Sequence, residues 1–477
     1  MRSFLFSPPR TSHRLSLVAA FLLATSFVSA ATYYVSPSGD DGNPGTTDQP
    51  FRTVQRGVTQ AVAGDTIVLG DGVYGNEGKI SDGTGGYNGY ATPVTVRSAG
   101  TSSAWITLKA QNRGQAILDC GTTATQMGCD KYIYLTGGAA YWQFQDLVLT
   151  GGAFGGLGTD EGASNINVTG CYFQNIGNWN NTTQIGEEGL GFDESASNWS
   201  VQGNVFTHIG RMGGTQLDHG IYAKGSNITV INNVFYNLTA GWSIQLADGA
   251  SNWLIANNTI AFPNPAKNGQ IMMWNSNTNI TIRNNIFYSP NNWAVDRYTS
   301  TVSGCWVDHN VVYGAGTMMA DNTGCQVSSN MLNTNPQVVS AATLDMELQP
   351  GSSVIGTGMA LAQVANDFLG LPRANSNDPG AYRFTPPATF QIVNTTTGQS
   401  TWNVGEQWSV TITGGLPNAA VAVTVGNWSG VVGSTDASGS FSTSGIAAAG
   451  NVGTTTELWT VAGAMVNPGL VTITVAP

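Results

Sequence analysis

Charge is scarce in this sequence, and its scarcity removes several classes of protein. Only 9% of the 477 residues are charged, with 17 basic and 28 acidic residues and a formal net charge of −11 at pH 7. Nucleic-acid binders need a basic stripe that displaces counterions from phosphates. Helical bundles have outer faces rich in Lys, Glu and Arg. Neither class fits, whereas 41% hydrophobic residues and 61 glycines suit a large, weakly charged β protein.

Long hydrophobic runs are also missing from residue 31 onward, where no apolar stretch approaches the roughly 18 residues of a membrane-spanning helix. The first 30 residues have the pattern of a secretory signal peptide. Arg10 and Arg14 precede a short apolar run, and a small-residue cleavage pattern ends at Ala30. We therefore expect cleavage after Ala30 and a secreted, extracellular monomer that binds neither membrane nor nucleic acid.

Cysteine is sparse as well, with five copies in the chain. No Cys or His spacing resembles a zinc site. Export permits disulfides without requiring them. Cys120 and Cys129 are placed to close one short loop. Cys305 and Cys325 begin two equivalent segments, GCWVDHN and GCQVSSN, and are candidates to pair on adjacent rungs, which leaves Cys171 over.

A repeat occupies the middle of the chain. Ser-Asn or Thr-Asn followed by an apolar residue recurs, and its asparagines are Asn165, Asn198, Asn227, Asn252 and Asn279. Each unit has an alternating strand, an Asn-containing turn, a second apolar strand and a third short strand. Three short strands in each coil of about 25 residues predict a parallel β-helix, in which each coil covers the hydrophobic edge of the next. The repeated asparagines are expected to form a ladder along the stack.

The N-terminal stretch fits the same plan. Residues 33–74 contain a strand, a turn and an amphipathic segment with Val54, Val58 and Val62 on one face. We expect this segment to form a short helix that caps the open end of the solenoid, which otherwise exposes a sheet edge.

Four phrases of the sequence carry a family resemblance. They are YYVSPSGDDGNPGT (33–46), PFRTVQRGV (50–58), AGDTIVLGDGVY (63–74) and the closing NDPGAYRF (377–384). In these phrases the chain resembles secreted right-handed β-helix proteins, especially polysaccharide lyases of the family 9 pectate lyase, chondroitinase B and alginate lyase type. The resemblance implies a right-handed β-helix over 31–384. Because this fold also hosts hydrolases, epimerases and adhesins, the activity must be argued from the site.

The composition of the sequence changes after Phe384. TPPAT (385–389) is typical of a linker, and residues 390–477 contain no Lys, Arg or His. Five alternating strands separated by Gly, Asn or Asp turns predict a small immunoglobulin-like β-sandwich there. The module is either a spacer or a carbohydrate binder that uses its tryptophans. The predicted fold is therefore all-β, a right-handed parallel β-helix with an N-terminal helical cap and a small C-terminal β-sandwich.

One stripe of the predicted solenoid combines groups that suit a sugar ring. Alternation along GIYAKG (220–225) turns Ile221 and Ala223 inward, and Tyr222 and Lys224 outward. The outward positions of neighbouring coils carry carboxylate, amide, thioether and aromatic side chains. These residues are Asp193, Gln245, Met272, Trp274, Asp296 and Tyr298.

The loop before that strand adds Arg211, Asp218 and His219. β-Elimination from a uronate requires three groups: a cation that neutralises the carboxylate, a base that removes the C5 proton, and an acid that protonates the departing O4. The resemblance to lyases on this fold makes Lys224 the first base candidate, with a pKa lowered by Arg211. Tyr222 or His219 is the expected acid or alternative base, and Arg211 the carboxylate ligand. His219 also has the parity of an inward, structural residue. The expected substrate-binding residues are Gln245, Trp274, Asp296, Tyr298 and Asp218.

Acidic residues recur at similar places in three repeats, in TDEG (159–162), FDES (192–195) and LADG (246–249). Stacked carboxylates raise each other's pKa unless a cation lies between them, so they indicate a candidate Ca²⁺ site. The same acids also suit exposed turns. The Asp-rich calcium cluster of pectate lyases is absent from the sequence, which argues against pectate as the substrate. The candidate ligands are Asp160, Glu161, Asp193, Glu194 and Asp248.

These features predict an enzyme, a secreted polysaccharide lyase that cleaves an anionic, uronate-containing glycan by β-elimination. Two alternatives stay open. One is a non-catalytic glycan-binding adhesin. The other is a glycoside hydrolase on the same fold, with two carboxylates as acid and base. The carboxylates available for it are Glu187, Glu188, Asp193, Asp218 and Asp296.

Overall fold

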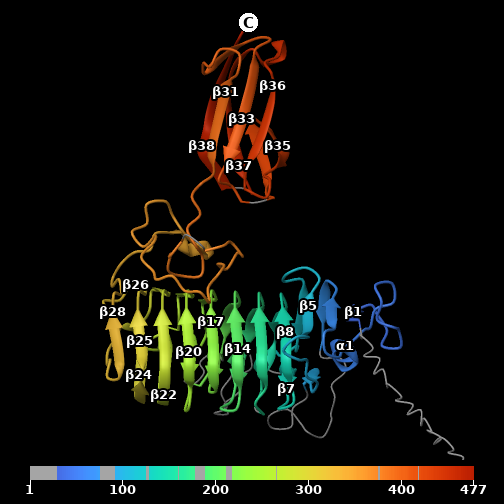
Figure 1. Cartoon of the computed structure of the whole chain (residues 1–477), viewed down its shortest axis with the longest axis vertical. Coiled ribbons are helices and arrows are strands. Elements are labelled where there is room, and N and C mark those ends of the chain that lie inside the picture. The colour runs from blue at the N-terminus through green and yellow to red at the C-terminus, as the bar shows by residue number, and fades with distance from the viewer. Residues whose placement is uncertain are drawn as a thin grey trace, which may run out of the picture.

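The computed structural model shows a β-solenoid followed by a C-terminal β domain (Figure 1). Among the described residues, no helix is long and apolar enough to cross a membrane. The predicted signal peptide lies outside the described residues except for Ser29 and Ala30. The structure describes residues 29–75, 92–124, 128–159, 161–177, 188–210, 217–264, 266–373, 376–416, 418–462 and 464–477.

Three parallel sheets run along the solenoid, and the coils supply their strands in the order sheet I, sheet II, sheet III. Sheet I carries the predicted site, and each of its strands pairs in parallel with the equivalent strand of the next coil. Its strands are β4 (Val94–Val96), β7 (Cys129–Leu135), β10 (Gly152–Thr159), β13 (Glu188–Phe192), β16 (His219–Ala223), β19 (Ile244–Leu246), the first half of β22 (Ile271–Arg283), β24 (Trp293–Ser303) and β27 (Thr317–Met319).

Sheets II and III complete each coil. Sheet II consists of β1 (Thr32–Val35), β2 (Thr66–Leu69), β5 (Ile106–Ala110), β8 (Ala140–Gln145), β11 (Ser164–Thr169), β14 (Ser197–Gln202), β17 (Ser226–Ile231), β20 (Ser251–Ala256), the second half of β22, β25 (Cys305–Asp308) and β28 (Cys325–Ser328). Sheet III consists of β3 (Gly72–Tyr74), β6 (Ala116–Asp119), β9 (Val148–Thr150), β12 (Tyr172–Ile176), β15 (Val205–Ile209), β18 (Val234–Tyr236), β21 (Thr259–Ala261), β23 (Ile286–Tyr288) and β26 (Val311–Tyr313). The predicted parallel β-helix is confirmed.

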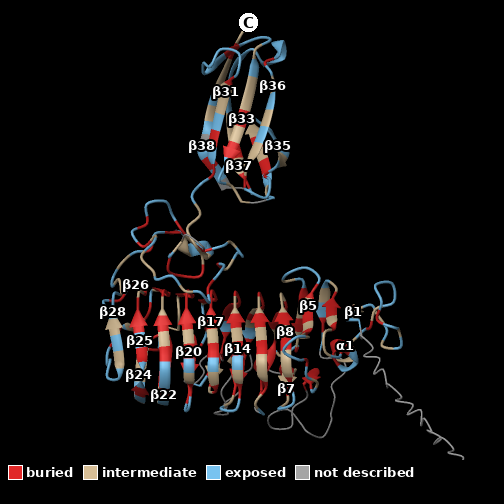
Figure 2. Cartoon of the chain, viewed as in Figure 1, coloured by how far each residue is buried: buried red, intermediate tan, exposed pale blue. Residues whose placement is uncertain are grey.

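The core lies between the three sheets, and equivalent side chains stack from coil to coil. Figure 2 shows buried residues along the strands of the solenoid. The ring of Phe206 lies 4.7 Å from that of Phe173 and 4.6 Å from that of Phe235, close to parallel with both. Such offset aromatic stacks add to the burial of each ring, so register errors between coils are penalised.

Helix α1 (Val54–Gln60) packs on β1, β2 and β4 at the N-terminal end of the solenoid. Thr53 accepts the amide of Arg56, and Val54 and Val58 are buried. The prediction that Val62 shares their face is wrong, because the helix ends at Gln60 and Val62 is 55% exposed. That α1 caps the solenoid stays a prediction.

Two asparagine ladders run along the solenoid. The exposed ladder begins the strands of sheet II, and its members from Asn198 to Asn279 hold positive φ angles and join amide to amide at 3.0–3.2 Å. This is the predicted ladder, although the amide of Asn165 instead contacts Ser164. A second, buried ladder lies between sheets II and III. Its members are Asn204, Asn233, Asn258, Asn285, Asn310 and Asn330.

Both suggested cysteine pairs are disulfide-bonded. Cys305 and Cys325 are register partners on β25 and β28. Cys171 is buried and unpaired. Its main-chain N–H donates to Asn204 Oδ1 over 2.8 Å, so Cys171 stands where the next coil has an asparagine of the buried ladder. Burial raises the pKa of its thiol to about 12, so this group is inert.

Residues after the last coil return to the solenoid. Strands β29 (Val338–Ser340) and β30 (Asp345–Leu348) form a hairpin around a short 3₁₀ turn, η2 (Ala341–Thr343). The Asn232 and Asn284 amides then donate to the carbonyls of Asn366 and Met359. The buried Arg373 guanidinium donates to the carbonyls of Gly380 and Ala381, which ties this segment together.

The C-terminal domain has its own core, formed by residues such as Phe390, Val410, Val421 and Trp459. Two mainly antiparallel groups of strands, joined by a parallel bridge at Thr389, contribute to it, and one short strand (401–403) pairs in parallel with the last strand. The first strand thus begins at the last residue of the expected linker. The immunoglobulin-like topology stays a prediction. The elements are β31 (Thr389–Asn394), β32 (Thr401–Asn403), β33 (Gln407–Thr413), β34 (Ala420–Val425), β35 (Trp428–Ser434), β36 (Phe441–Ile446), η3 (Ala449–Asn451), β37 (Gly453–Val461) and β38 (Ala464–Ala476).

Candidate functional site

The register of sheet I aligns the predicted outward residues across four coils. Tyr222 on β16 faces Gln245 on β19, which pairs with Met272 on β22 and then with Asp296 on β24. We call these four residues the outward row. The alternating positions Ile221, Ile244 and Ile271 are fully buried, as predicted for inward side chains. In the outward row Tyr222 and Asp296 are half-buried, whereas Gln245 and Met272 are buried as well.

Trp274 and Tyr298 are register partners two residues beyond the outward row. Trp274 is half-buried, and Tyr298 is 54% exposed. Gln245 is buried, and its Oε1 has no hydrogen-bond partner among the described residues. Burial raises the pKa of Asp296 above the ordinary value of an aspartate. The site thus offers an aromatic pair beside hydrogen-bonding groups, an arrangement that suits a pyranose ring.

His219 lies on the same side of β16 as Tyr222, contrary to its predicted inward parity. The ring centroids of His219 and Tyr222 lie 5.6 Å apart in a stacked arrangement, and the His219 ring also stacks on Trp242 at 5.7 Å. The irregularity is at Gly220, where a Cβ would meet the core ring of Phe235 at 3.1 Å. Consecutive residues Gly220 and Ile221 therefore both face the core, which returns His219 to the side of Tyr222.

Burial holds His219 neutral. Desolvation, with a smaller contribution from the Lys267 charge, lowers its pKa to about 3. The main-chain N–H of Trp242 donates to His219 Nδ1 over 3.3 Å, so Nε2 carries the hydrogen. Close contact of the coils is possible because Gly241, with φ +66°, lies where a Cβ would be 1.1 Å from the carbonyl oxygen of Asp218. His219 is therefore suited to hold the Tyr222 ring and unsuited to accept a proton.

Lys224 does not have the lowered pKa predicted for it. Its Nζ donates to Glu194 Oε2 over 2.8 Å, and this bond raises the Lys224 pKa. Arg211, which was expected to lower it, lies outside the described residues. Lys224 therefore keeps its proton at neutral pH, which suits charge neutralisation better than proton abstraction. Burial raises the pKa of Tyr222, and the charge of Lys224 opposes that rise.

The remaining predicted ligand, Asp218, is fully buried directly before His219. It is near enough to Lys267 for its charge to favour the ammonium form of that side chain. Neither Trp242 nor Lys267 was singled out from the sequence. Both lie in segments that precede strands, where no periodicity marks them, and only the stacking of coils brings them to His219.

The acids of the candidate calcium site do not fit a cation site in the part of the chain that the structure describes. No group of three or more His, Cys, Asp or Glu side chains is arranged there to hold a metal. Glu161 accepts from the amide of Gly137, Asp193 from Ser195, and Asp248 from Ser276. Glu194 is bound to Lys224. Asp160 lies outside the described residues. Ca²⁺ stays a prediction, and no chemical step below depends on it.

A second ionic pair on sheet I was also missed. Lys131 on β7 is 4% exposed, and its Nζ lies 3.2 Å from Glu188 Oε1 on β13. The Lys131 stem crosses the intervening strand β10 at Gly155 and Gly158, where Cβ atoms would come within 2.9–3.0 Å of it. Gly155 and Gly158 are three residues apart, so regular alternation would place them on opposite faces of β10 and the sequence pattern did not reveal this crossing. Glu188 thus has a cationic partner, which makes it a poor member of a hydrolytic carboxylate pair.

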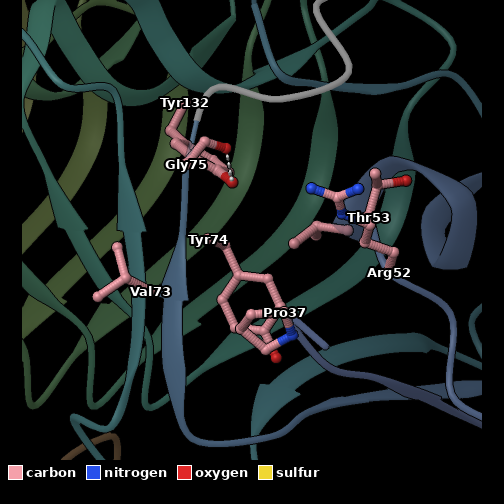
Figure 3. A pocket seen from close by; sticks show the side chains of 8 residues that line it. Pro37, Arg52, Thr53, Val73, Tyr74, Gly75 and Tyr132 are labelled. Carbon is pink, nitrogen blue, oxygen red and sulfur yellow. Dashed lines mark hydrogen bonds between the residues drawn. The ribbon is translucent and has the colours of Figure 1, made fainter. Parts of the chain in front are cut away.

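A small hollow lies elsewhere, at the N-terminal end of the solenoid (Figure 3). Pro37, Arg52, Val73 and Tyr74 line it, and the Tyr132 hydroxyl donates to the carbonyl of Gly75 at its edge. None of the predicted site residues takes part in it. The outward row is not part of this hollow; Tyr222 and Asp296 at its ends are half-buried, and Gln245 and Met272 between them are buried.

Known proteins share this fold and part of the sequence. Residues 33–189 match the family described as Pel9A-like, right handed beta helix region, and residues 188–358 match the more general right handed beta helix region. Pectate lyase PEL9 of Emericella nidulans is 34% identical over 136 residues, which span 27% of this chain and 30% of that protein.

Two solved structures are similar at lower identity. Pectate lyase Pel9A aligns with a TM-score of 0.47 and 16% identity, over 76% of this chain and 98% of that chain. A mannuronic-acid-specific lyase of polysaccharide family 6 from human gut microbiota aligns with a TM-score of 0.37 and 17% identity, over 64% and 59%. The chain therefore contains a right-handed β-helix whose first half is related to that of the Pel9A-like family.

Proposed function

We propose that this protein is a polysaccharide lyase that cleaves a uronate-containing glycan by β-elimination on the outer side of sheet I. The observation that carries the proposal is the outward row, in which Tyr222, Gln245 and Asp296 align across neighbouring coils beside Trp274 and Tyr298. The match to the Pel9A-like family over residues 33–189 supports the same class of chemistry.

In this proposal Tyr222 is the proton-transfer residue. Its phenolate takes the C5 proton, the electrons of that C–H bond form the C4–C5 double bond, and the C4–O4 bond breaks. The phenol then returns the proton to the departing O4. Lys224 stabilises the substrate carboxylate because it stays charged, and its charge also favours the phenolate. Arg211 remains a proposed second carboxylate ligand.

The pH dependence follows from these roles. Burial raises the Tyr222 pKa, so the phenolate fraction grows as pH rises above neutrality. The bond to Glu194 raises the Lys224 pKa, so this cation persists over the same range. We therefore expect kcat/KM to increase from pH 7 into the alkaline range. A profile that falls steadily above pH 7 would contradict Tyr222 as the base.

The first experiment incubates the mature protein with alginate, polygalacturonate, glucuronan and glycosaminoglycans and follows ultraviolet absorbance from the new double bond. Tyr222→Phe should lower kcat by about 10²- to 10⁴-fold, the range of general acid–base catalysis. Tyr236→Phe is the matched control, because Tyr236 is a half-buried tyrosine on sheet III. New reducing ends without absorbance would replace the lyase with a hydrolase. Binding without either product would leave the adhesin.

A further inference from the structure

Lys267 is a mostly buried cation beside the outward row. It lies in the segment between β21 and β22 and is 7% exposed. Its Nζ lies 4.6 Å above the centre of the Trp242 ring. Within the described parts of the chain, its side chain has no carboxylate at salt-bridge distance and no hydrogen-bond acceptor. By contrast, Lys131 and Lys224 each contact a glutamate directly.

This arrangement is unfavourable for the protein by itself. Burial penalises the ammonium form and lowers the Lys267 pKa, and the Asp218 charge opposes this only in part. A cation–π contact with Trp242 replaces part of the lost hydration. A methionine would cover the same ring without the desolvated charge. A buried cation without a carboxylate at salt-bridge distance is therefore a candidate functional group.

The surroundings connect Lys267 with the proposed site. Trp242, on which Lys267 lies, stacks on His219, and His219 stacks on Tyr222. Two residues after Lys267, the Cβ position of Gly269 lies 3.0 Å from Cβ of Asp296 in the outward row. Lys267 thus borders the same face as Tyr222 but belongs to the segment entering β22, two coils along the solenoid axis from β16.

We propose that Lys267, supported by Trp242, is an anion-binding position that contacts the carboxylate of a second uronate unit of the bound polymer. The inference rests on the proposed function, because it assumes a polyuronate lying along the solenoid axis. Lys224 follows the end of β16 and Lys267 precedes the start of β22, two coils of about 4.8 Å along the axis, so in this proposal the two lysines contact different sugars of one chain. The substrate class it implies has consecutive or closely spaced uronates, not isolated ones.

The test uses Lys267→Met, with Lys109→Met on β5 as the matched control and Lys267→Arg to restore the charge. On a polymer that the wild type cleaves, Lys267→Met should raise KM by about tenfold or more, with kcat within about twofold, because a charge-assisted contact is lost from binding. The dependence of KM on salt should become shallower, and Lys267→Arg should recover most of the affinity. Lys109→Met should leave KM and its salt dependence unchanged.

The melting temperature separates this role from a structural one. Methionine keeps the contact with Trp242 and removes a desolvated charge, so Lys267→Met should melt at the wild-type temperature or above it. A lower melting temperature together with an unchanged KM would overturn the inference and make Lys267 a structural residue. An unchanged KM with unchanged melting would overturn it as well.

A separate binding measurement distinguishes failure of the inference from failure of the proposed function. Electrophoresis through gels containing polygalacturonate or alginate reports affinity without cleavage. If the wild type cleaves neither polymer but is retarded by one, and Lys267→Met is retarded less, the lyase proposal fails and the anion-binding position stands. Equal retardation of the two proteins refutes the anion-binding role of Lys267 and leaves the lyase proposal untouched. If neither polymer is cleaved and neither retards the wild type, both proposals are refuted.

Discussion

Replacing Asn258 by alanine tests whether the buried asparagine ladder stabilises the solenoid. Asn258 is fully buried and makes four side-chain hydrogen bonds. Its Oδ1 accepts the main-chain N–H and the amide of Asn233, at 2.8 and 3.0 Å. Its Nδ2 donates to the Val230 carbonyl and to Asn285 Oδ1, at 2.9 and 3.0 Å. Alanine removes all four and leaves the main-chain N–H of Asn233 without this acceptor.

The expected loss of unfolding free energy follows from the four hydrogen bonds that alanine removes. Net contributions of about 0.5–1.5 kcal/mol for each bond, together with a buried donor left unpaired, predict that the free energy of unfolding falls by roughly 3–5 kcal/mol. Asn252→Gly is the control in the same coil. Asn252 also bonds two ladder neighbours, but it is exposed, so water replaces the lost bonds and we expect a loss below about 1 kcal/mol. Glycine is chosen because Asn252 holds φ +57°.

Urea unfolding followed by tryptophan fluorescence gives both values, provided that the slopes of the free energy against urea agree among the proteins. The solenoid's stability is a sum over coils and their interfaces, so one broken rung weakens the coupling of two neighbours. A loss below about 1 kcal/mol for Asn258→Ala, or equal losses for the two variants, would refute the argument that burial makes the ladder stabilising.

Two further predictions concern buried ionisable groups. Lys131→Met leaves Glu188 without its cationic partner, so the free energy of unfolding should fall by about 3–5 kcal/mol in urea titrations, whereas Lys224→Met, which breaks the more exposed pair with Glu194, should shift the urea midpoint far less. His219 remains neutral in the native state until about pH 3 while the unfolded chain protonates near 6.5, so native stability is lost as pH falls between these values. In that window the free energy of unfolding of the wild type should fall by about 1.4 kcal/mol per pH unit relative to that of His219→Gln. If the two proteins showed parallel curves of unfolding free energy against pH, the buried neutral state of His219 would be contradicted.

Much of the fold was predictable from the sequence because each solenoid coil repeats the same local pattern of turn residues and alternating apolar residues. Asn198, Asn227 and Asn252 mark equivalent turns, and their exposed ladder follows from that spacing. Alternation along each strand separates inward residues such as Ile221 from outward residues such as Tyr222. The limit of this reasoning is visible at Val62, where the helix ended earlier than its periodicity suggested.

The candidate site was predictable only where strict alternation holds. The row from Tyr222 to Asp296 follows from alternation plus coil register. His219 was misplaced because Gly220 interrupts the alternation, and period-two arguments cannot detect a single irregular residue. The Lys224 pKa was predicted in the wrong direction because its dominant partner, Glu194, is thirty residues away in sequence and lies beside it only after coiling.

Periodicity and turn chemistry within one or two coils were enough to predict the class of architecture, the phase of its coils and the side chains that point into the core. Which charges pair, and which polar groups lose their hydration, became visible only in the folded structure. Lys131 reaches Glu188 across two glycines, and Lys267 lies over Trp242 with no carboxylate of the described chain at salt-bridge distance. The physical reason is that electrostatic and desolvation energies depend on distances across coils, which no local pattern encodes.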